Sequence, residues 1–410
     1  MYLTDESWLA LTRDDLRKVI LANVDMDPGV FALKQSDRDF PYATVATQLK
    51  YLQKAVKKLP TYHHHRALIP PRAYEQSSSE AVANLKELQG DTLLDLTLGL
   101  GVDARRFAQD ITKVTALEQD AVLARITGYN FGLFGLSNVE IRSGKSEEFL
   151  KSYRAAPFDW VYADPARRDE RGQRVHALGD LQPDLTALWP ELQRVGRRLM
   201  VKASPLLDLQ AAAQALPGVR ALYLHSLDGE VKELLIEADL SASVYSPLSQ
   251  VQVHYRLRYG AEVMRYTLPL LPEPLAPQAQ CPAEPAYLCE PDPAFYKHQS
   301  LAAWIKRYHP EWPAWLNHPR GFFFSDTAPE PWPGRIFRLQ ERLPYKPKAL
   351  KRFFKQQGLS RLNVLRRHFP LDVRQIRQQL QLQEGGDQFL ICTTWAGEKV
   401  AWLAERCVVR

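Results

Sequence analysis

Between Leu93 and Asp239 the chain alternates short apolar runs with helical segments, and this alternation constrains the fold more than any other feature. Seven runs have the length and aliphatic content of buried strands: TLLDLTL, KVTALE, VEIRS, DWVYAD, RLMVKAS, VRALYLHS and VKELLIEAD. Segments such as AVLARITGYNFGLFG and LLDLQAAAQAL lie between them and are typical of helices. Buried runs separated by helices predict a parallel sheet that is covered on both faces.

The last two runs are joined differently, by the short stretch LDGE. Asp228-Gly229 is a hairpin turn signal, and so short a link forces the two strands to run antiparallel. We therefore expect an α/β fold with a doubly wound, mostly parallel sheet of seven strands and an antiparallel last strand. The period-two pattern of QVQVHYRLRYG predicts a further strand after it.

The rest of the chain divides into segments of different character. Apolar residues at helical spacing in SWLALTRDDLRKVILANV and ATVATQLKYLQKAVKKLP predict an N-terminal helical region. The stretch EQSSSEAVANLKEL predicts a serine-capped helix that runs to Leu88. Eight prolines between Pro269 and Pro293 favour an extended linker, with small α+β units beyond it. The predicted domains are 1–85 (helical region), 86–268 (α/β sheet), 269–285 (linker), 286–330 (first small domain) and 331–410 (second small domain).

Composition narrows the class of protein. The 410 residues are too many for one ordinary domain. The four cysteines form no CxxC or Cys/His spacing, which indicates a reducing compartment without a disulfide framework or zinc site. The adjacent His63, His64 and His65 point in different directions, so no metal site is expected. No apolar run reaches the ~18 residues that cross a bilayer and the N-terminus does not read as a signal peptide, so we expect a cytoplasmic protein without a membrane partner.

Positive charge is concentrated near the C-terminus. Residues 341–380 hold eleven Lys or Arg against two acids, a net charge of +9. Because the whole chain carries +6, the remainder is slightly acidic, at −3. Segregated positive charge is typical of a phosphate-binding surface, although a solvated helix face explains a lone basic stretch equally well.

A glycine-rich turn, LTLGLGVDA, follows the first predicted strand. Gly99 and Gly101 let backbone N–H groups approach a ligand, and the helix that follows presents its N-terminus to polar groups. Glu118, about 20 residues on, closes the second strand, where an acid binds ribose hydroxyls in dinucleotide folds. The pattern fits NAD(P) or S-adenosylmethionine, and a glycine turn without a ligand is the alternative.

Two carboxylates distinguish these ligands. Asp95 lies four residues before Gly99, where it would repel a pyrophosphate but attract the ammonium of S-adenosylmethionine. The fourth predicted strand ends in Asp164-Pro165. Ligands of doubly wound sheets bind beyond the carboxyl ends of the strands, at the point where strand order reverses. We therefore expect the glycine turn and the acid-proline corner to face one crevice, although Asp164 is also suited to a plain turn or helix cap.

With these motifs, the sequence resembles the class I S-adenosylmethionine-dependent methyltransferases. It looks most like the bacterial group with a C-terminal THUMP-like domain that a small ferredoxin-like piece precedes. The resemblance covers nearly the whole chain and is carried by LLDLTLGLGVDA, YADPARRD, VKASPLLD, YLCEPDP, PGRIFRL and EGGDQFLICTT, among others. It implies that 86–268 is the methyltransferase domain, 286–330 the ferredoxin-like piece and 331–410 the THUMP-like, RNA-binding domain.

The resemblance also implies how S-adenosylmethionine is bound. The residues from Asp95 to Gly101 would surround its methionine part, Glu118 would bind its ribose, and the segment from Gln76 would close over it. RSGKSEEF departs from the family, because many members have an acid where Gly144 and Lys145 stand, which leaves adenine to Ser146 or to backbone. The candidate cofactor-binding residues are Gln76, Ser77, Ser78, Asp95, Leu98, Gly99, Gly101, Glu118, Gln119 and Ser146.

DPAR resembles the Asp/Asn-Pro-Pro-aromatic motif of enzymes that methylate amino nitrogens of bases. The Asp164 carboxylate and the Pro165 carbonyl can accept the two N–H groups of such an amine and stabilise the positive charge that develops. Arg167, which replaces the aromatic, can stack on a base through its guanidinium plane. The candidate catalytic residues are therefore Asp164, Pro165 and Arg167. VKASPLLD has Ser204 but no cysteine, which argues against a covalent base methylase.

The sequence thus predicts an S-adenosylmethionine-dependent methyltransferase that modifies a base nitrogen of RNA, either tRNA or rRNA. Phosphate contacts would position the RNA. The candidate RNA-binding residues are Arg168, Lys346, Lys348, Lys351, Arg352, Lys355, Arg361, Arg366 and Arg367. Two alternatives stay open: an RNA-binding or assembly factor with a degenerate cofactor pocket, which Lys145 and Ala166 would mark, and an NAD(P)-dependent oxidoreductase, against which Asp95 argues. The oligomeric state is not indicated.

Overall fold

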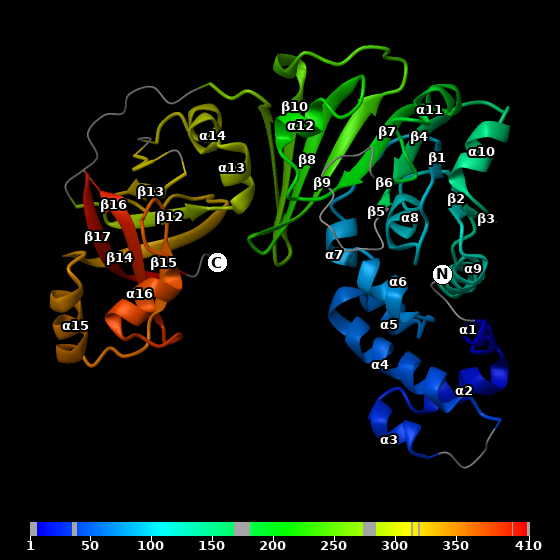
Figure 1. Cartoon of the computed structure of the whole chain (residues 1–410), viewed down its shortest axis with the longest axis horizontal. Coiled ribbons are helices and arrows are strands. Elements are labelled where there is room, and N and C mark those ends of the chain that lie inside the picture. Colours follow the sequence, from blue (N-terminus) through cyan, green and yellow to red (C-terminus); the bar gives the residue numbers. More distant parts are fainter. Residues whose placement is uncertain are drawn as a thin grey trace. The chain divides into compact units, whose positions relative to one another are not determined.

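The computed structural model of the chain comprises two compact units, which are considered separately below (Figure 1). The first contains Met1–Leu227 and Lys232–Val251, and the second contains Asp228–Val231 and Gln252–Arg410. The structure describes residues 6–34, 39–167, 181–273, 284–312, 315–318, 320–395 and 397–407. No helix among these residues combines the length and the apolar character that a membrane crossing requires.

The first unit is built around the predicted sheet. Its strands are β1 (Thr92–Asp95), β2 (Lys113–Glu118), β3 (Val139–Ser143), β4 (Phe158–Ala163), β7 (Gly196–Ala203), β8 (Val219–Leu227) and β9 (Glu230–Asp239). They lie in the order β8-β9-β7-β4-β1-β2-β3. The strands from β3 to β7 pair in parallel, whereas β9 runs antiparallel to β7. This arrangement confirms the predicted mostly parallel α/β sheet with an antiparallel last strand.

The reversal between β8 and β9 has the expected local cause. Asp228 and Gly229 both have positive φ, 50° and 81°, which is the backbone of the tightest hairpin turns. The strand order also changes direction between β1 and β4, because the chain builds the sheet outward from β1 to β3 and then returns to the middle to form β4. Ligands of such sheets bind at this switch point, beyond the carboxyl ends of the two strands.

Helices follow most strands, as the alternation predicts. They are α8 (Val102–Phe107), α9 (Ala121–Leu133), α10 (Ser146–Ser152), α11 (Trp189–Val195) and α12 (Leu209–Ala213). Asp120 starts α9, because its carboxylate accepts from the N–H groups of Val122 and Leu123. A short antiparallel pair, β5 (Ala166–Arg167) and β6 (Leu181–Gln182), was not predicted.

The N-terminal region is helical, as expected, and consists of α1 (Ser7–Ala10), α2 (Asp14–Ala22), α3 (Pro28–Ala32), α4 (Tyr42–Lys58), α5 (Pro60–His64), α6 (Pro71–Gln76) and α7 (Glu80–Ala83). The last helix ends before the predicted Leu88. After Ala83 the chain is no longer helical, and it buries Lys86, whose ammonium pairs with Asp103 and Glu233. Helical spacing in a sequence does not show such a tertiary ion pair.

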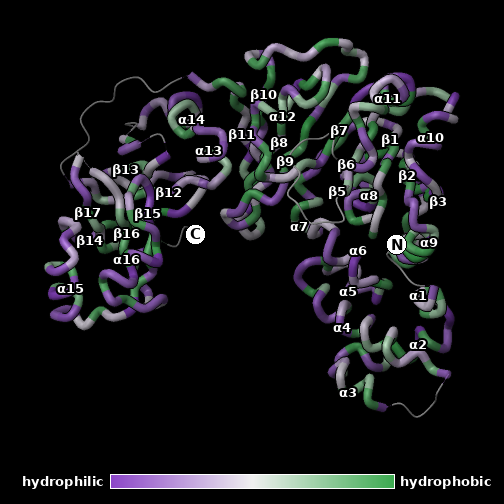
Figure 2. The backbone as a smooth tube through the Cα atoms, in the orientation of Figure 1, coloured by the Kyte–Doolittle hydropathy of each residue, from purple (hydrophilic) through white to green (hydrophobic). Residues whose placement is uncertain are grey.

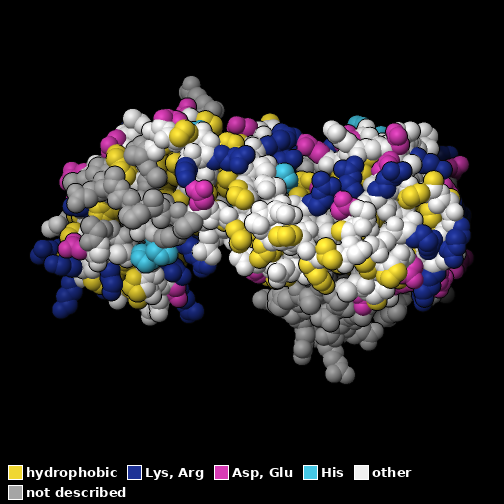
Figure 3. Space-filling model, turned by 90° about the horizontal axis from the view of Figure 1, so that it is seen from above, with side chains coloured by type: hydrophobic (Ala, Val, Ile, Leu, Met, Phe, Trp, Pro, Cys, Tyr) yellow, Lys and Arg dark blue, Asp and Glu magenta, His cyan; other side chains and the backbone are white. Residues whose placement is uncertain are grey.

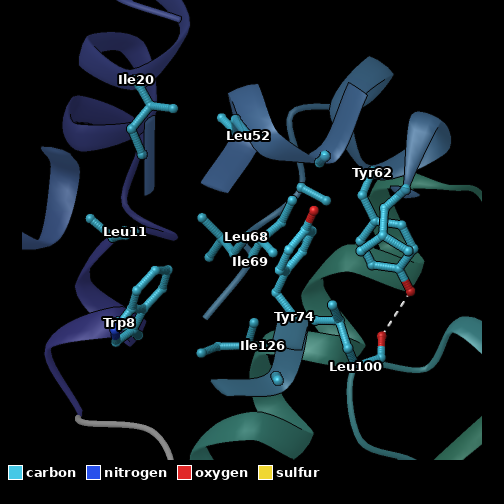
Figure 4. Packing of buried hydrophobic residues seen from close by; sticks show 14 of the residues in the cluster. Trp8, Leu11, Ile20, Leu52, Tyr62, Leu68, Ile69, Tyr74, Leu100 and Ile126 are labelled. Carbon is cyan, nitrogen blue, oxygen red and sulfur yellow. Dashed lines mark hydrogen bonds between the residues drawn. The ribbon is translucent and has the colours of Figure 1, made fainter. Parts of the chain in front are cut away.

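The helical region shares one hydrophobic core with α9 and the glycine turn. Trp8, Leu11 and Leu52 belong to the same buried cluster as Leu100 and Ile126 (Figure 4). The colouring of α9 is largely hydrophobic in Figure 2, which fits a helix enclosed on several sides. The Tyr62 hydroxyl donates to the Leu100 carbonyl (2.7 Å), so a hydrogen bond also fixes the turn to the helices.

The second unit begins with an antiparallel hairpin of β10 (Gln252–Tyr259), which was predicted, and β11 (Glu262–Pro269). A six-stranded sheet follows, in the order β13-β12-β14-β17-β16-β15. Its strands are β12 (Tyr287–Pro291), β13 (Phe323–Ser325), β14 (Gly334–Pro344), β15 (Asn363–Arg366), β16 (Gln388–Trp395) and β17 (Glu398–Arg406). The helices are α13 (Pro293–His298), α14 (Leu301–Tyr308), α15 (Pro347–Gln356) and α16 (Val373–Leu380).

This sheet draws strands from both predicted small domains. β12 and β13 fall in 286–330, and the other four strands fall in 331–410. β12 pairs with β14 over five residues, so the boundary at residue 330 separates strands of one sheet. The edge strand β15 was not predicted, because its residues lie in the basic stretch and show little apolar alternation. The domain boundaries themselves stay predictions.

Candidate active site

Asp95 ends β1 with its carboxyl group almost fully buried, at 1% exposure. Its Oδ1 accepts from the Thr97 N–H (2.8 Å). Among the residues that the structure describes, no hydrogen-bond donor reaches Oδ2, although that atom is buried. Burial raises the pKa of Asp95 to about 8, and the nearby carboxylates of Asp103 and Asp164 act in the same direction. An unpartnered buried carboxylate oxygen is suited to a cationic ligand group.

The two positions of the turn require glycine for different physical reasons. Both have positive φ, 55° at Gly99 and 80° at Gly101. A Cβ on Gly99 would meet no described atom within 4 Å and would project into open space. A Cβ on Gly101 would lie 2.5 Å from Cζ of Phe131 in α9. Gly99 therefore borders space that a ligand can fill, whereas packing against α9 is sufficient to require Gly101.

Glu118, at the end of β2, holds the turn in place. Its Oε2 accepts from the Gly99 N–H (2.8 Å), and its Oε1 accepts from the Asp120 N–H (2.9 Å). Burial raises the pKa of Glu118, and these two hydrogen bonds oppose the rise. Each oxygen keeps a second lone pair for a ligand hydroxyl. Gln119, the next residue, is exposed.

The turn after β3 closes the other side of this corner. Ser146 begins α10, and its hydroxyl donates to the Leu96 carbonyl (2.6 Å). The Gly144 N–H donates to the Glu118 carbonyl (2.9 Å), and the Leu98 N–H donates to the Leu117 carbonyl (2.9 Å). These contacts bring Leu98, Glu118 and Ser146 to one corner, and their role in cofactor binding stays a prediction. The Ser146 oxygen has lone pairs left but no spare hydrogen.

The acid-proline corner lies directly beside Asp95. The Asp164 N–H donates to Thr97 Oγ1 (2.7 Å), and Thr97 in turn donates its N–H to Asp95. Thr97 therefore joins the end of β4 to the end of β1. Pro165 is buried. The backbone of Arg167 lies in β5 and pairs with Leu181. Arg168 lies outside the described residues.

Lys202 on β7 is a member of this corner that the sequence analysis missed. The parallel register sets Val201 beside Ala163, which brings the next residue, Lys202, beside Asp164. Lys202 Nζ donates to Asp164 Oδ2 (2.6 Å) and to Ser78 Oγ (3.0 Å). Burial works to lower the pKa of Lys202, but Asp164 and the other nearby carboxylates outweigh it and raise that pKa. Burial also raises the pKa of Asp164, against the effect of Lys202.

A buried polar network lies next to this pair and was also missed. Lys86 Nζ donates to Asp103 Oδ1 (2.9 Å) and to Glu233 Oε2 (2.8 Å). The Tyr162 hydroxyl donates to Asp103 Oδ2 (2.7 Å). The side chain of Lys86 is 1% exposed. A lone lysine in NLKELQG has no pattern that reveals such burial, whereas the VKAS match to the family offers a signal for Lys202.

The segment that was predicted to close over the cofactor reaches the corner only in part. Ser78 accepts from Lys202, and its hydroxyl is 3.4 Å from Asp103 Oδ2. Ser77 instead donates to the Tyr74 carbonyl in its own helix (2.9 Å). Gln76 is exposed at the end of α6. A cofactor role for these three residues stays a prediction.

Apart from Arg168, the predicted RNA-binding residues belong to the second unit. Leu350 and Phe354 of α15 are buried, so the basic residues of this helix occupy its outer face. Lys and Arg side chains gather at the end of the view in Figure 3 that carries the C-terminal part of the chain. The exposed residues of the predicted set are Lys346, Lys348, Arg352, Lys355, Arg361 and Arg366, and the half-buried ones are Lys351 and Arg367.

Arg367 differs from the rest of that set. Its guanidinium lies over the Tyr296 ring, 4.0 Å from the centroid, and 3.5 Å from a carboxylate oxygen of Glu290. These contacts are sufficient to explain Arg367 as part of the domain's own structure. No group of three or more His, Cys, Asp or Glu in the described part of the chain is placed to hold a metal ion.

Comparisons with known proteins agree with this architecture. Residues 334–406 match the family model described as THUMP domain-like. A crystal structure of a candidate methyltransferase from Porphyromonas gingivalis W83 matches with a TM-score of 0.83 and 26% identity over 100% of both chains. No curated protein matches the sequence.

Matches to other solved structures cover part of the chain. A candidate methyltransferase from Streptococcus mutans in complex with SAH matches 39% of this chain and 94% of its own, with 14% identity and a TM-score of 0.27. An rRNA methylase from Streptococcus thermophilus matches 39% of this chain and 93% of its own, with 15% identity and a TM-score of 0.28. Sheet order, THUMP-like match and full-length similarity together show that this chain has the class I methyltransferase fold with a THUMP-like domain at residues 334–406.

Proposed function

We propose that the protein is an S-adenosylmethionine-dependent methyltransferase that acts on RNA. One observation carries the proposal: a buried carboxylate oxygen of Asp95 at the end of β1 has no described partner, and the turn that follows borders open space at Gly99. The ammonium of the methionine part would pair with Asp95, and the ribose hydroxyls would donate to Glu118. When bound, S-adenosylmethionine supplies an electrophilic methyl group on a sulfonium. Thr97 links this cradle to Asp164, which would orient the acceptor.

The same turn is poorly suited to a dinucleotide. Rossmann turns bind a pyrophosphate through free backbone N–H groups. Here the Gly99 N–H donates to Glu118, and the Gly101 N–H donates to the Leu98 carbonyl (2.9 Å). The carboxylates of Asp95 and Glu118 would also repel a pyrophosphate. These contacts favour S-adenosylmethionine over NAD(P), the ligand of the oxidoreductase alternative.

The THUMP-like domain and the exposed basic face of α15 support RNA as the substrate, either tRNA or rRNA. The Asp-Pro-Ala-Arg motif predicts that the methyl group goes to a base nitrogen. That prediction needs Asp164 and the Pro165 carbonyl to accept both hydrogens of an amine. One oxygen of Asp164 already accepts from Lys202, so the chemistry of this corner depends on that lysine as well.

Calorimetry and methyl transfer together test the proposal. Wild-type protein should bind S-adenosylmethionine, and Asp95→Leu should lose that binding while it keeps its fold, as circular dichroism can verify. Tritiated methyl groups should then pass to RNA and not to protein lysate, and Asp164→Ala should abolish the transfer. An absence of binding heat with wild-type protein that still binds RNA would favour the alternative of a non-catalytic RNA-binding factor. Label in protein alone would overturn RNA as the substrate.

A further inference from the structure

The ion pair of Lys202 and Asp164 lies near the carboxyl ends of β7 and β4. Asp164 lies one hydrogen-bonded residue, Thr97, away from Asp95. The side chain of Lys202 is 17% exposed and that of Asp164 is 36% exposed. The pair is therefore neither a surface salt bridge nor sealed in the core, and a substrate group can reach it from the exposed side of Asp164.

Behind the pair lies a buried polar network whose members already contact one another. Asp103 and Glu233 share the ammonium of Lys86 at 2.9 and 2.8 Å. Glu233 also contacts Nδ1 of His225 (2.8 Å), and Asp103 accepts from the Tyr162 hydroxyl. This buried network neighbours the corner but lies deeper, since the side chains of Lys86 and Glu233 are 1% and 2% exposed. Lys202 and Asp164 are the partly accessible cation and anion of the set.

An amine acceptor is poorly matched to this corner. As an amino nitrogen attacks the methyl carbon, positive charge develops on the nitrogen, and its hydrogens need anionic or carbonyl acceptors. Asp164 Oδ2 already accepts from an ammonium at 2.6 Å, which reduces the negative charge available to the amine. The ammonium would in addition stand beside a developing positive charge, and like charges repel.

A hydroxyl acceptor suits the same pair, both in where its proton goes and in the sign of the charge that develops. A hydroxyl must lose its proton as it is methylated, and a carboxylate can receive that proton. A fixed ammonium beside the oxygen stabilises the negative charge that proton loss produces. The carboxylates around Lys202 keep it protonated, as the raised pKa indicates, so it serves as the cation and not as the base.

We propose, on the basis of the function proposed above, that the methyl acceptor is a ribose 2′-hydroxyl of RNA and that Lys202 and Asp164 are its catalytic residues. The acceptor oxygen forms a bond to the methyl carbon, and the carbon–sulfur bond breaks with its electron pair retained by sulfur. The hydroxyl proton passes to the Asp164 carboxylate and then to water. Lys202 donates a hydrogen bond to the acceptor oxygen and balances the charge of the deprotonated form.

The chemical position of the label tests this directly. A methyl group on the 2′-oxygen blocks attack of that oxygen on the neighbouring phosphate, so alkali leaves the labelled nucleotide in a dinucleotide. A methyl group on a base leaves it in a mononucleotide. Wild-type protein is incubated with tritiated S-adenosylmethionine and with tRNA and rRNA transcribed in vitro, which carry no methyl groups. Label in alkali-stable dinucleotides is the expected result. Label in mononucleotides would overturn the inference and leave the proposed function intact.

Variants separate a catalytic lysine from a merely structural one. Lys202→Met should lower the transfer rate about a hundredfold or more, which is the usual range for a lost acid–base or electrostatic group. Its affinity for S-adenosylmethionine, measured by calorimetry, should stay within about threefold of wild type, since Asp95 and Glu118 are unchanged. Lys113→Met, at an exposed position on β2, is the matched control and should change neither quantity.

Two further outcomes would count against the inference. Equal losses of rate and of cofactor affinity in Lys202→Met would assign Lys202 a structural role. If that variant does not fold, Lys202→Arg keeps the charge, and the label position in wild type still decides between oxygen and nitrogen. An absence of label in RNA from wild-type protein that binds S-adenosylmethionine would instead contradict the proposed function, and the inference with it.

Discussion

At the scale of single residues, Asp95 combines features that a protein rarely keeps for stability alone. Its carboxyl is buried, one oxygen has no described donor, and its pKa is raised to about 8. The sequence pointed to Asp95 because a carboxylate four residues before Gly99 would repel a pyrophosphate and attract an ammonium. It did not reveal Lys202 in the same way, because the pairing of Lys202 with Asp164 depends on the register of two strands that are about 40 residues apart in the chain.

This raised pKa predicts proton release on cofactor binding. At pH 7 the free Asp95 is mostly protonated, because its pKa is about 8. Pairing with an ammonium requires the carboxylate, so binding should release close to one proton. The affinity should therefore increase from pH 6 toward pH 8 and decline above that, because the α-amino group of the ligand, with a pKa of about 8, then loses the proton that the pairing needs. Calorimetry in buffers of different ionisation enthalpy measures the released protons.

The control for this prediction is Asp95→Asn, which has no proton to release. Its residual binding heat should be independent of the buffer. Buffer-independent heat in wild type would show that Asp95 is already ionised before the cofactor binds, which would contradict the raised pKa.

At the scale of elements, the glycine turn illustrates what a motif does and does not reveal. The spacing of Gly99 and Gly101 predicts a turn before a helix, and the structure has that turn. It does not distinguish a glycine that borders a ligand space from one that packs against a helix. The contact of Gly101 with Phe131 joins elements 30 residues apart, which no local pattern can show.

The two glycines should respond differently to alanine. Gly101→Ala combines a left-handed backbone with a Cβ at 2.5 Å from Phe131, so it should cost about 3 kcal/mol or more of unfolding free energy. Gly99→Ala meets open space and should cost about 1–2 kcal/mol from its backbone alone. It should also weaken binding of S-adenosylmethionine. Urea unfolding and calorimetry measure both, and equal stability losses would refute the distinction.

The buried network behind the site predicts a further stability effect. Lys86→Met leaves Asp103 and Glu233 without their shared ammonium and should cost about 3–5 kcal/mol of unfolding free energy. Lys57→Met, at an exposed position of α4, is the matched control and should stay within about 0.5 kcal/mol of wild type. A small effect of Lys86→Met in urea unfolding would mean that the two carboxylates take up protons or water without penalty.

At the scale of the whole molecule, most of what could be predicted from the sequence came from its charge pattern and its hydrophobic pattern. The alternation from Leu93 to Asp239 predicted the sheet of the first unit, because buried parallel strands are the most strongly patterned elements in a sequence. The pairing of β12 with β14 in the second unit could not be predicted, since it joins residues some 45 positions apart in the chain. Strand β15 was not predicted because it is short and lies in the basic stretch.

The basic face of α15 predicts salt-dependent RNA binding. Lys348→Gln with Lys355→Gln removes two exposed charges, so the slope of log affinity against log salt should fall by about 2. Lys50→Gln with Lys57→Gln on α4 removes the same charge elsewhere and should leave the slope unchanged. Filter binding with tRNA across salt concentrations measures this. Identical slopes for both double variants would show that α15 makes no phosphate contact.

The N-terminal helices share a hydrophobic core with α9 and the glycine turn. This shared core limits how short an active fragment of the chain can be. A recombinant piece that starts at residue 86 would lack Trp8, Leu52 and Tyr62, and would leave Leu100 and Ile126 facing solvent. Such a piece should aggregate or bind the methyl donor weakly, even though it retains Asp95, Gly99 and Glu118. The helices ahead of the sheet therefore hold the glycine turn in place.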